Sequence, residues 1–90
     1  MTEPNDVDPF MVTSATLGHS PLHRLSAREQ EAAVLVVAAR VAYISEPVAR
    51  GAEAARQLGC TTELYQDALD RARSRSRRVR AKDRAVRAAS

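Results

Sequence analysis

Aromatic side chains are nearly absent from this chain of 90 residues. Phe10, Tyr43 and Tyr65 are its aromatic residues, and it contains no Trp. A core must therefore be built from Ala, Val, Leu and Ile, which suits closely packed helices better than a β-sandwich. The sequence predicts an all-α fold of one small domain. Because so small a domain buries only a modest part of its surface, a homodimer is the expected state.

The charge of the chain is strongly segregated. The net charge at pH 7 is +3, but residues 1–70 carry ten acids against five Arg, whereas residues 71–90 carry nine basic residues against Asp83 alone. An acidic body with a basic end is typical of a chain that meets a polyanion at that end. The alternative is a solvated tail that keeps an Ala-rich protein in solution.

The first 24 residues show no sustained hydrophobic period. They contain every proline except Pro47, together with Gly18 and several Ser and Thr. This composition is typical of an extended or disordered segment. We therefore expect a flexible N-terminal arm at 1–24, a helical domain at 25–74 and a basic helix or tail at 75–90.

A helix start is predicted at Ser26. Glu29 follows three residues later, so the hydroxyl and the carboxylate can each accept a backbone N–H of the other residue in a capping box. The apolar run at 32–44 is favoured as a helix by its length, this cap and its Ala content. Being apolar on nearly all sides, it is the candidate core or dimer helix. The predicted dimer or partner contacts are Val34, Val37, Val41 and Ile44.

Two more helices complete a predicted domain of three. The second spans about 46–58, because Pro47 suits a first helical turn and Gly59 can adopt the left-handed conformation that ends a helix. The third begins at Thr61 or Thr62. No Gly or Pro follows it, so the last residues either continue this helix or form a tail.

The junction of these two helices has the pattern of a helix-turn-helix. Such a motif needs a small residue where its helices touch and a Gly in the turn, and Ala55 and Gly59 meet both needs. The predicted inward positions around them are Ala54, Leu58, Cys60, Tyr65 and Ala68. The segments "LSAREQE" at 25–31 and "LGCTTE" at 58–63 resemble the DNA-binding helix-turn-helix domains of region four of bacterial sigma factors and of LuxR-type regulators. The resemblance covers about 25–73 and implies DNA binding.

The third helix would then enter the major groove. The residues predicted to point outward are Thr61, Thr62, Glu63, Gln66, Asp67 and Asp70. Gln66 can pair with adenine and Glu63 can accept from cytosine N4, but such readout needs cations that fix the register on the phosphates. The predicted phosphate-binding residues are Arg71, Arg73, Arg75, Arg77, Arg78 and Arg80.

Enzymatic and metal-dependent functions lack the residues that they require. His19 and His23 are separated by Pro21, and with Cys60 they provide no fourth zinc ligand. The single cysteine can form no intrachain disulfide. The sequence contains no Gly-rich phosphate loop, and its carboxylates are expected on solvent faces. We expect no enzyme, no cofactor, no metal and no small-molecule substrate.

The longest apolar run, 32–44, is too short to cross about 30 Å of hydrocarbon and contains Arg40. We therefore expect a cytoplasmic protein without membrane contact. The favoured function is that of a small DNA-binding regulator of transcription or of a mobile element such as a phage or plasmid. The alternative is a helical adaptor or assembly protein that binds a protein partner, such as a polymerase, a virion component or itself, through its apolar helix.

Overall fold

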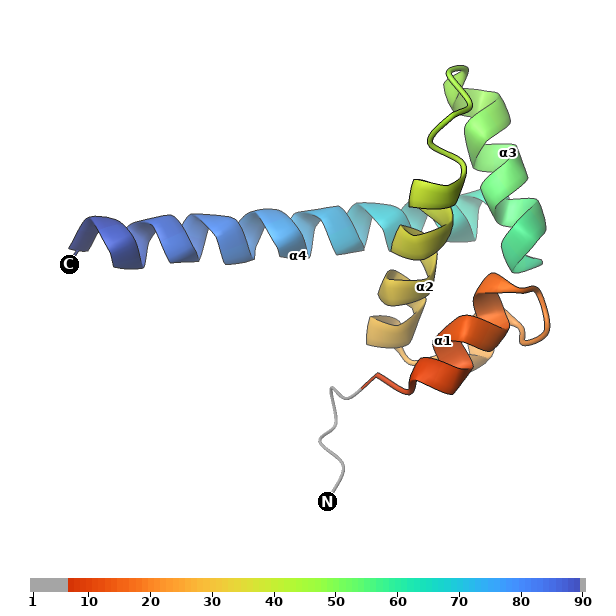
Figure 1. The fold of residues 1–90 in the computed structure, drawn as a ribbon, viewed down its shortest axis with the longest axis horizontal. Helices are drawn as coiled ribbons and strands as arrows, with labels where there is room; N and C mark the ends of the chain where they lie inside the picture. Colours follow the sequence, from red (N-terminus) through yellow and green to blue (C-terminus); the bar gives the residue numbers. More distant parts are fainter. Residues whose placement is uncertain (1–6, 90) are drawn as a thin grey trace.

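The computed structural model describes the backbone of residues 7–89 and the side chains of residues 7–78. This part of the chain is entirely helical, which confirms the all-α prediction, and it contains four α-helices where three were expected (Figure 1). They are α1 (Pro9–Thr16), α2 (Ala27–Arg40), α3 (Pro47–Leu58) and α4 (Thr62–Ala89), with the short 3-10 helix η1 (Leu22–Arg24) between α1 and α2.

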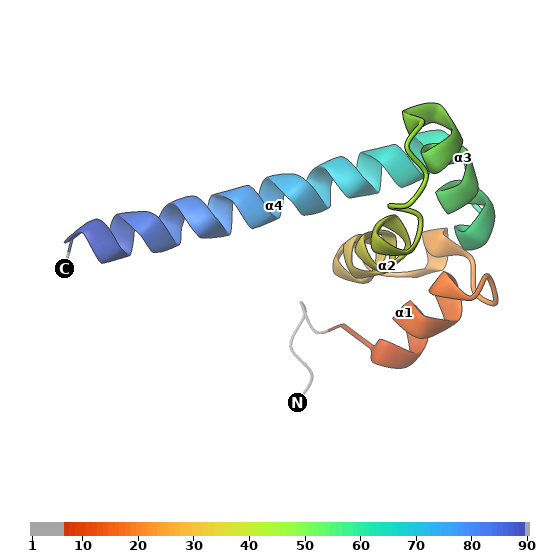
Figure 2. The ribbon, with the colours of Figure 1, turned by 45° about the horizontal axis from the view of Figure 1, so that its top comes forward.

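The additional helix, α1, replaces part of the predicted flexible arm. It begins at Pro9 because the Asp8 carboxylate accepts the Phe10 N–H at 2.9 Å and proline suits a first helical turn. Ala15 is fully buried in the core. The prediction of a flexible arm is therefore wrong for the described residues 7–24, because they pack against α2 and cover one side of it. Figure 2 shows α2 between α1 and α4.

The predicted capping box at the start of α2 is confirmed. Glu29 N–H donates to the Ser26 hydroxyl at 3.2 Å, and Ser26 N–H donates to Glu29 Oε1 at 2.9 Å. Glu29 Oε2 also accepts the Asp8 N–H at 2.9 Å, so one carboxylate joins the starts of two helices. These backbone hydrogen bonds lower the pKa of Glu29.

The predicted interface residues of α2 lie in the core of the protein. Val34, Val37 and Val41 have exposed fractions of 0%, and Ile44 is half-buried against them. The expectation that they contact a second chain is corrected, because α2 is packed against α1, α3 and α4 and these side chains face that core. The large apolar side chains that α2 leaves at the surface are Leu35 and Val36, which are 42% and 45% exposed.

The connection between α3 and α4 is short and tightly defined. Gly59 adopts the left-handed conformation, with φ 66° and ψ 35°, and Cys60 N–H returns to the Ala55 carbonyl at 3.0 Å. The residues predicted to face inward are buried, except Cys60, which is half-buried. The predicted left-handed conformation of Gly59 is therefore confirmed, and α4 begins at Thr62, one of the two predicted starts.

Candidate nucleic-acid interface

The residues predicted to face a DNA groove lie together at the start of α4. Thr61, Thr62, Glu63 and Gln66 are all exposed, and they follow directly on the turn after α3. Thr61 also caps α4, because its hydroxyl accepts the Leu64 N–H at 3.1 Å. The turn and the first turns of α4 thus present polar side chains at the surface.

A line of carboxylates occupies one edge of the same helix. Glu63, Asp67 and Asp70 are exposed and are spaced by four and three residues, which places them one above another. Asp67 Oδ2 lies 3.8 Å from Arg71 Nε. Because phosphates carry the same charge, a DNA-facing surface on α4 has to lie beside this edge rather than on it.

Two of the predicted phosphate-binding arginines are engaged within the protein. Arg75 donates from Nε to Glu31 Oε1 at 2.7 Å and from Nη2 to Glu31 Oε2 at 3.3 Å. Arg71 Nη2 donates to Gln30 Oε1 at 3.1 Å. All of these hydrogen bonds join α4 to α2. These two guanidinium groups therefore help to hold α4 against α2, so part of their hydrogen-bonding capacity is used within the protein; their contact with phosphate stays a prediction.

The partner of Arg75 is a buried carboxylate that was expected on a solvent face. Glu31 is 5% exposed, whereas the Arg75 side chain is 44% exposed. The hydrogen bond from Arg75 has the largest effect on the pKa of Glu31 and lowers it, whereas burial of the carboxylate raises it. Charged Glu31 thus stabilises the fold through a charge-assisted hydrogen bond.

Three other predicted cations are exposed on α4. Arg73, Arg77 and Arg78 have no described carboxylate within ion-pair distance, and the Arg77 Nη2 atom lies 3.5 Å from Ser74 Oγ. Arg80 lies outside the described side chains. The described part of α4 therefore offers three exposed positive charges without a described carboxylate partner, beyond its acidic first turns.

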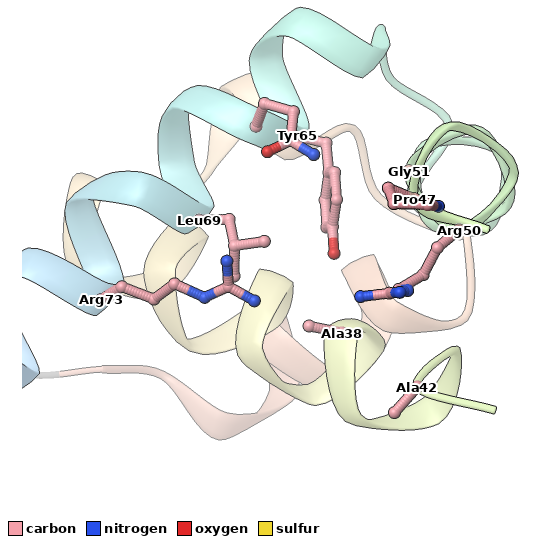
Figure 3. Close-up of a pocket in the computed structure, with 9 residues that line it drawn as sticks. Ala38, Ala42, Pro47, Arg50, Gly51, Tyr65, Leu69 and Arg73 are labelled. Atoms are coloured by element: carbon pink, nitrogen blue, oxygen red, sulfur yellow. The ribbon is translucent and has the colours of Figure 1, made fainter. Parts of the chain in front are cut away.

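A pocket with two arginines lies beside the acidic edge. Arg50 of α3 and Arg73 of α4 approach it from opposite sides, and the Tyr65 hydroxyl points between them (Figure 3). We call this the cationic pocket. Its volume is about 240 Å³. The other lining residues, none of which carries a carboxylate, are Ala38, Ala42, Pro47, Gly51, Gln66 and Leu69.

Arg50 is a candidate site residue that sequence reasoning missed. Its Nε donates to the Ile44 carbonyl at 2.8 Å and its Nη2 to the Ser45 carbonyl at 3.1 Å, so the connection between α2 and α3 holds the guanidinium group in place. The available clue was its position near the N-terminus of α3, where the helix dipole disfavours a cation.

Other chemistry has little support in the described residues. No group of three or more His, Cys, Asp or Glu side chains is placed to hold a metal ion there, and no helix in that part is long and apolar enough to cross a bilayer. Burial raises the pKa of the Cys60 thiol, which disfavours the reactive thiolate. Comparisons with protein-family models, curated proteins and solved structures found no match.

Proposed function

We propose that this protein binds duplex DNA, with α3, the turn at 59–61 and the start of α4 acting as a helix-turn-helix. The observation that carries the proposal is the exposed polar start of α4, followed on the same helix by the accessible cations Arg73, Arg77 and Arg78. Polar side chains at the start of a recognition helix contact base edges, and cations hold phosphates on either side.

The structure changes which edge of α4 suits this role. Three polar or cationic residues follow Thr62 at spacings of four, eleven and fifteen positions, namely Gln66, Arg73 and Arg77. At 3.6 residues per turn, all four residues fall on one edge of the helix within about 60° of arc. This polar and cationic edge lies beside the carboxylate line. In the proposed complex Gln66 contacts a base, while Arg73 and Arg77 contact phosphates.

A salt titration with a matched charge control tests the proposal. Fluorescence anisotropy would measure the binding of a labelled random duplex to the wild type, to the double variant R73Q/R77Q, and to the double variant R24Q/R28Q. Both variants carry the same reduced net charge, but the control residues lie outside α3 and α4. The slope of log K against log salt should become shallower by about 0.9 for each phosphate that is no longer neutralised. We therefore expect a change of roughly two in the α4 variant and a much smaller change in the control.

Two results would contradict DNA binding. The first is that the wild type shows no salt-dependent binding at low ionic strength. The second is that the two double variants weaken binding equally, which would reflect net charge alone. Circular dichroism of each variant serves as the check that its helices are retained. The proposed role in transcription or in control of a mobile element depends on a positive outcome here.

Exposed apolar side chains on α2 favour a second candidate function, that of an adaptor or self-assembling protein. Leu35 and Val36 are nearly half exposed, and they provide an apolar surface for association in place of the buried valines. If a homodimer forms there, the substitutions L35E and V36E should lower the mass measured by light scattering. A mass that is independent of both substitutions would contradict this interface.

A further inference from the structure

Two positive charges converge on the cationic pocket without a carboxylate to offset them. Arg50 comes from α3 and Arg73 from α4, and their guanidinium groups face each other across the pocket (Figure 3). Like charges that converge in a partly enclosed space repel each other more strongly than on an open surface. An anion between the two groups would replace this repulsion with attraction.

The phenol of Tyr65 adds a hydrogen-bond donor at the same place. Tyr65 is 2% exposed, and its hydroxyl points into the pocket between the two arginines (Figure 3). The hydroxyl therefore faces the space of the pocket, where a bound group can accept a hydrogen bond from it. Burial raises the pKa of Tyr65, although Arg73 and Arg50 act against this rise, so the hydroxyl is protonated at neutral pH and is able to donate.

The combination of donors identifies the class of ligand. Guanidinium groups bind oxyanions with paired N–H donors, and the most strongly bound oxyanions are carboxylate and phosphate. Two guanidinium groups on opposite sides, with a phenol between them, match a tetrahedral group with several acceptor oxygens better than a planar carboxylate. The volume of about 240 Å³ exceeds the space of several water molecules and so admits such a group.

We propose that Arg50, Tyr65 and Arg73 bind a phosphate group in the cationic pocket. The phosphate is either that of a small molecule or a backbone phosphate of DNA. The second source rests on the proposed function and has a structural basis, because Gln66 lines the pocket and also belongs to the polar edge of α4. In both cases Arg50 is fixed by the Ile44 and Ser45 carbonyls, whereas Arg73 is exposed.

The test compares each substitution in the pocket with a matched substitution outside it. R73Q removes one cation of the pocket, and R77Q removes a cation of the same helix that does not line it. Y65F removes the hydroxyl without a change of charge, and Y43F does the same to a tyrosine that is 80% exposed. Y65F should be about as stable as the wild type without phosphate, because no hydrogen bond among the described residues is lost. Substitutions of Arg50 are avoided, since it braces the α2–α3 connection.

In the first arm, thermal unfolding is followed by circular dichroism while sodium phosphate replaces sodium chloride at constant ionic strength. A ligand that binds the folded state raises Tm in a saturable manner. We expect this rise for the wild type, Y43F and R77Q, its loss in R73Q, and an affinity for inorganic phosphate about tenfold lower in Y65F, as for the loss of one hydrogen bond to a charged group. General stabilisation by phosphate as a salt would affect all five proteins equally.

In the second arm, the affinity for a labelled duplex is measured at one salt concentration for the wild type, Y65F and Y43F. A weaker affinity in Y65F alone shows that the pocket holds a backbone phosphate, because this substitution removes no positive charge. If the wild type does not bind the duplex, the proposed DNA function fails and the first arm alone decides on the pocket. Two results would overturn the proposal. One is that Y65F has the same phosphate affinity and the same duplex affinity as Y43F. The other is that R73Q keeps the phosphate-dependent rise in Tm and Y65F keeps the duplex affinity of the wild type.

Discussion

Glu31 offers the sharpest test of how α4 is attached to the rest of the protein. The substitution E31Q keeps the shape of the side chain and one acceptor oxygen, but it removes the charge from the hydrogen bond to Arg75 at 2.7 Å. A hydrogen bond to a charged group contributes about 1.5–3 kcal/mol and a neutral one about 0.5–1.5 kcal/mol. Because solvent screens the exposed Arg75, we expect a loss of about 1 kcal/mol in the free energy of unfolding, which lowers Tm by roughly 4–8 °C in a domain of this size.

The reverse substitution should be more harmful, and the double variant should partly correct it. R75A leaves a carboxylate that is 5% exposed without its hydrogen-bond donor, and removal of one member of a pair is costly for the member that stays buried. Adding E31Q to R75A removes the unpaired charge, so the double variant should be more stable than R75A alone. The nearby charges of Arg71 and Arg28 reduce the size of this effect without changing its sign.

The pH dependence follows from the lowered pKa of Glu31. Its folded-state pKa lies below the ordinary value of 4.5, so the stability that it contributes is present above about 4.5 and is lost as the pH falls through the folded-state value. Urea unfolding of the four proteins should show a deficit of E31Q at pH 7 that shrinks in acid. A double variant less stable than R75A, or a deficit of E31Q that does not depend on pH, would refute the assigned role of this pair.

Local geometry sets the outcome of four further measurements. G59A should lose about 1 kcal/mol in urea unfolding, because φ is 66° and a Cβ there is strained even though it meets no neighbour within 4 Å; unchanged stability would contradict the left-handed cap. S26A should lose about 1 kcal/mol with the Ser26 hydroxyl cap, as measured by the same method. V37A should lose about 2 kcal/mol at all protein concentrations because Val37 is core, whereas L35A should lose less than half as much. Iodoacetamide should modify Cys60 more slowly in the folded than in the urea-unfolded protein, because burial raises its pKa, and equal rates would contradict its half-buried position.

The features that sequence reasoning predicted correctly are set by neighbouring residues. The capping box at Ser26 and the left-handed Gly59 depend on backbone groups within a few positions, so a short pattern suffices to find them. The all-α class followed from the scarcity of aromatic residues. The exposed start of α4 followed from the position of the turn.

The features that it missed depend on interactions between distant segments. Helix α1 has eight residues, and an isolated helix of that length is unstable in water, so its stability comes from packing on α2. The apolar pattern of α2 indicated burial but not what would cover Val37, which made a dimer interface and a core position equally consistent with it. The pairing of Arg75 with Glu31 joins residues 44 positions apart, and no local pattern encodes it.

The same reasoning applies to the candidate site. The sequence identified Arg73 as a cation that could hold phosphate, but it did not identify Arg50 as its neighbour. That juxtaposition requires the relative placement of α3 and α4, which is fixed by the turn at Gly59 and by the burial of Tyr65. Charge segregation along the chain therefore indicated a cationic end of the protein but not which of its arginines are paired with other helices.

The place of α1 in the core bears on how the protein can be shortened. Arg40 of α2 donates from Nη1 to the Thr16 carbonyl at 2.8 Å and to Gln57 Oε1 of α3 at 3.1 Å, so α1, α2 and α3 share one bracing side chain. A fragment that starts near residue 25 would lack α1, which packs on α2, and would remove the Thr16 carbonyl that accepts one of the two Arg40 hydrogen bonds. The smallest piece that folds autonomously should therefore begin no later than Asp8, and proteases that cut within α1 should act on the native protein only through its unfolded population.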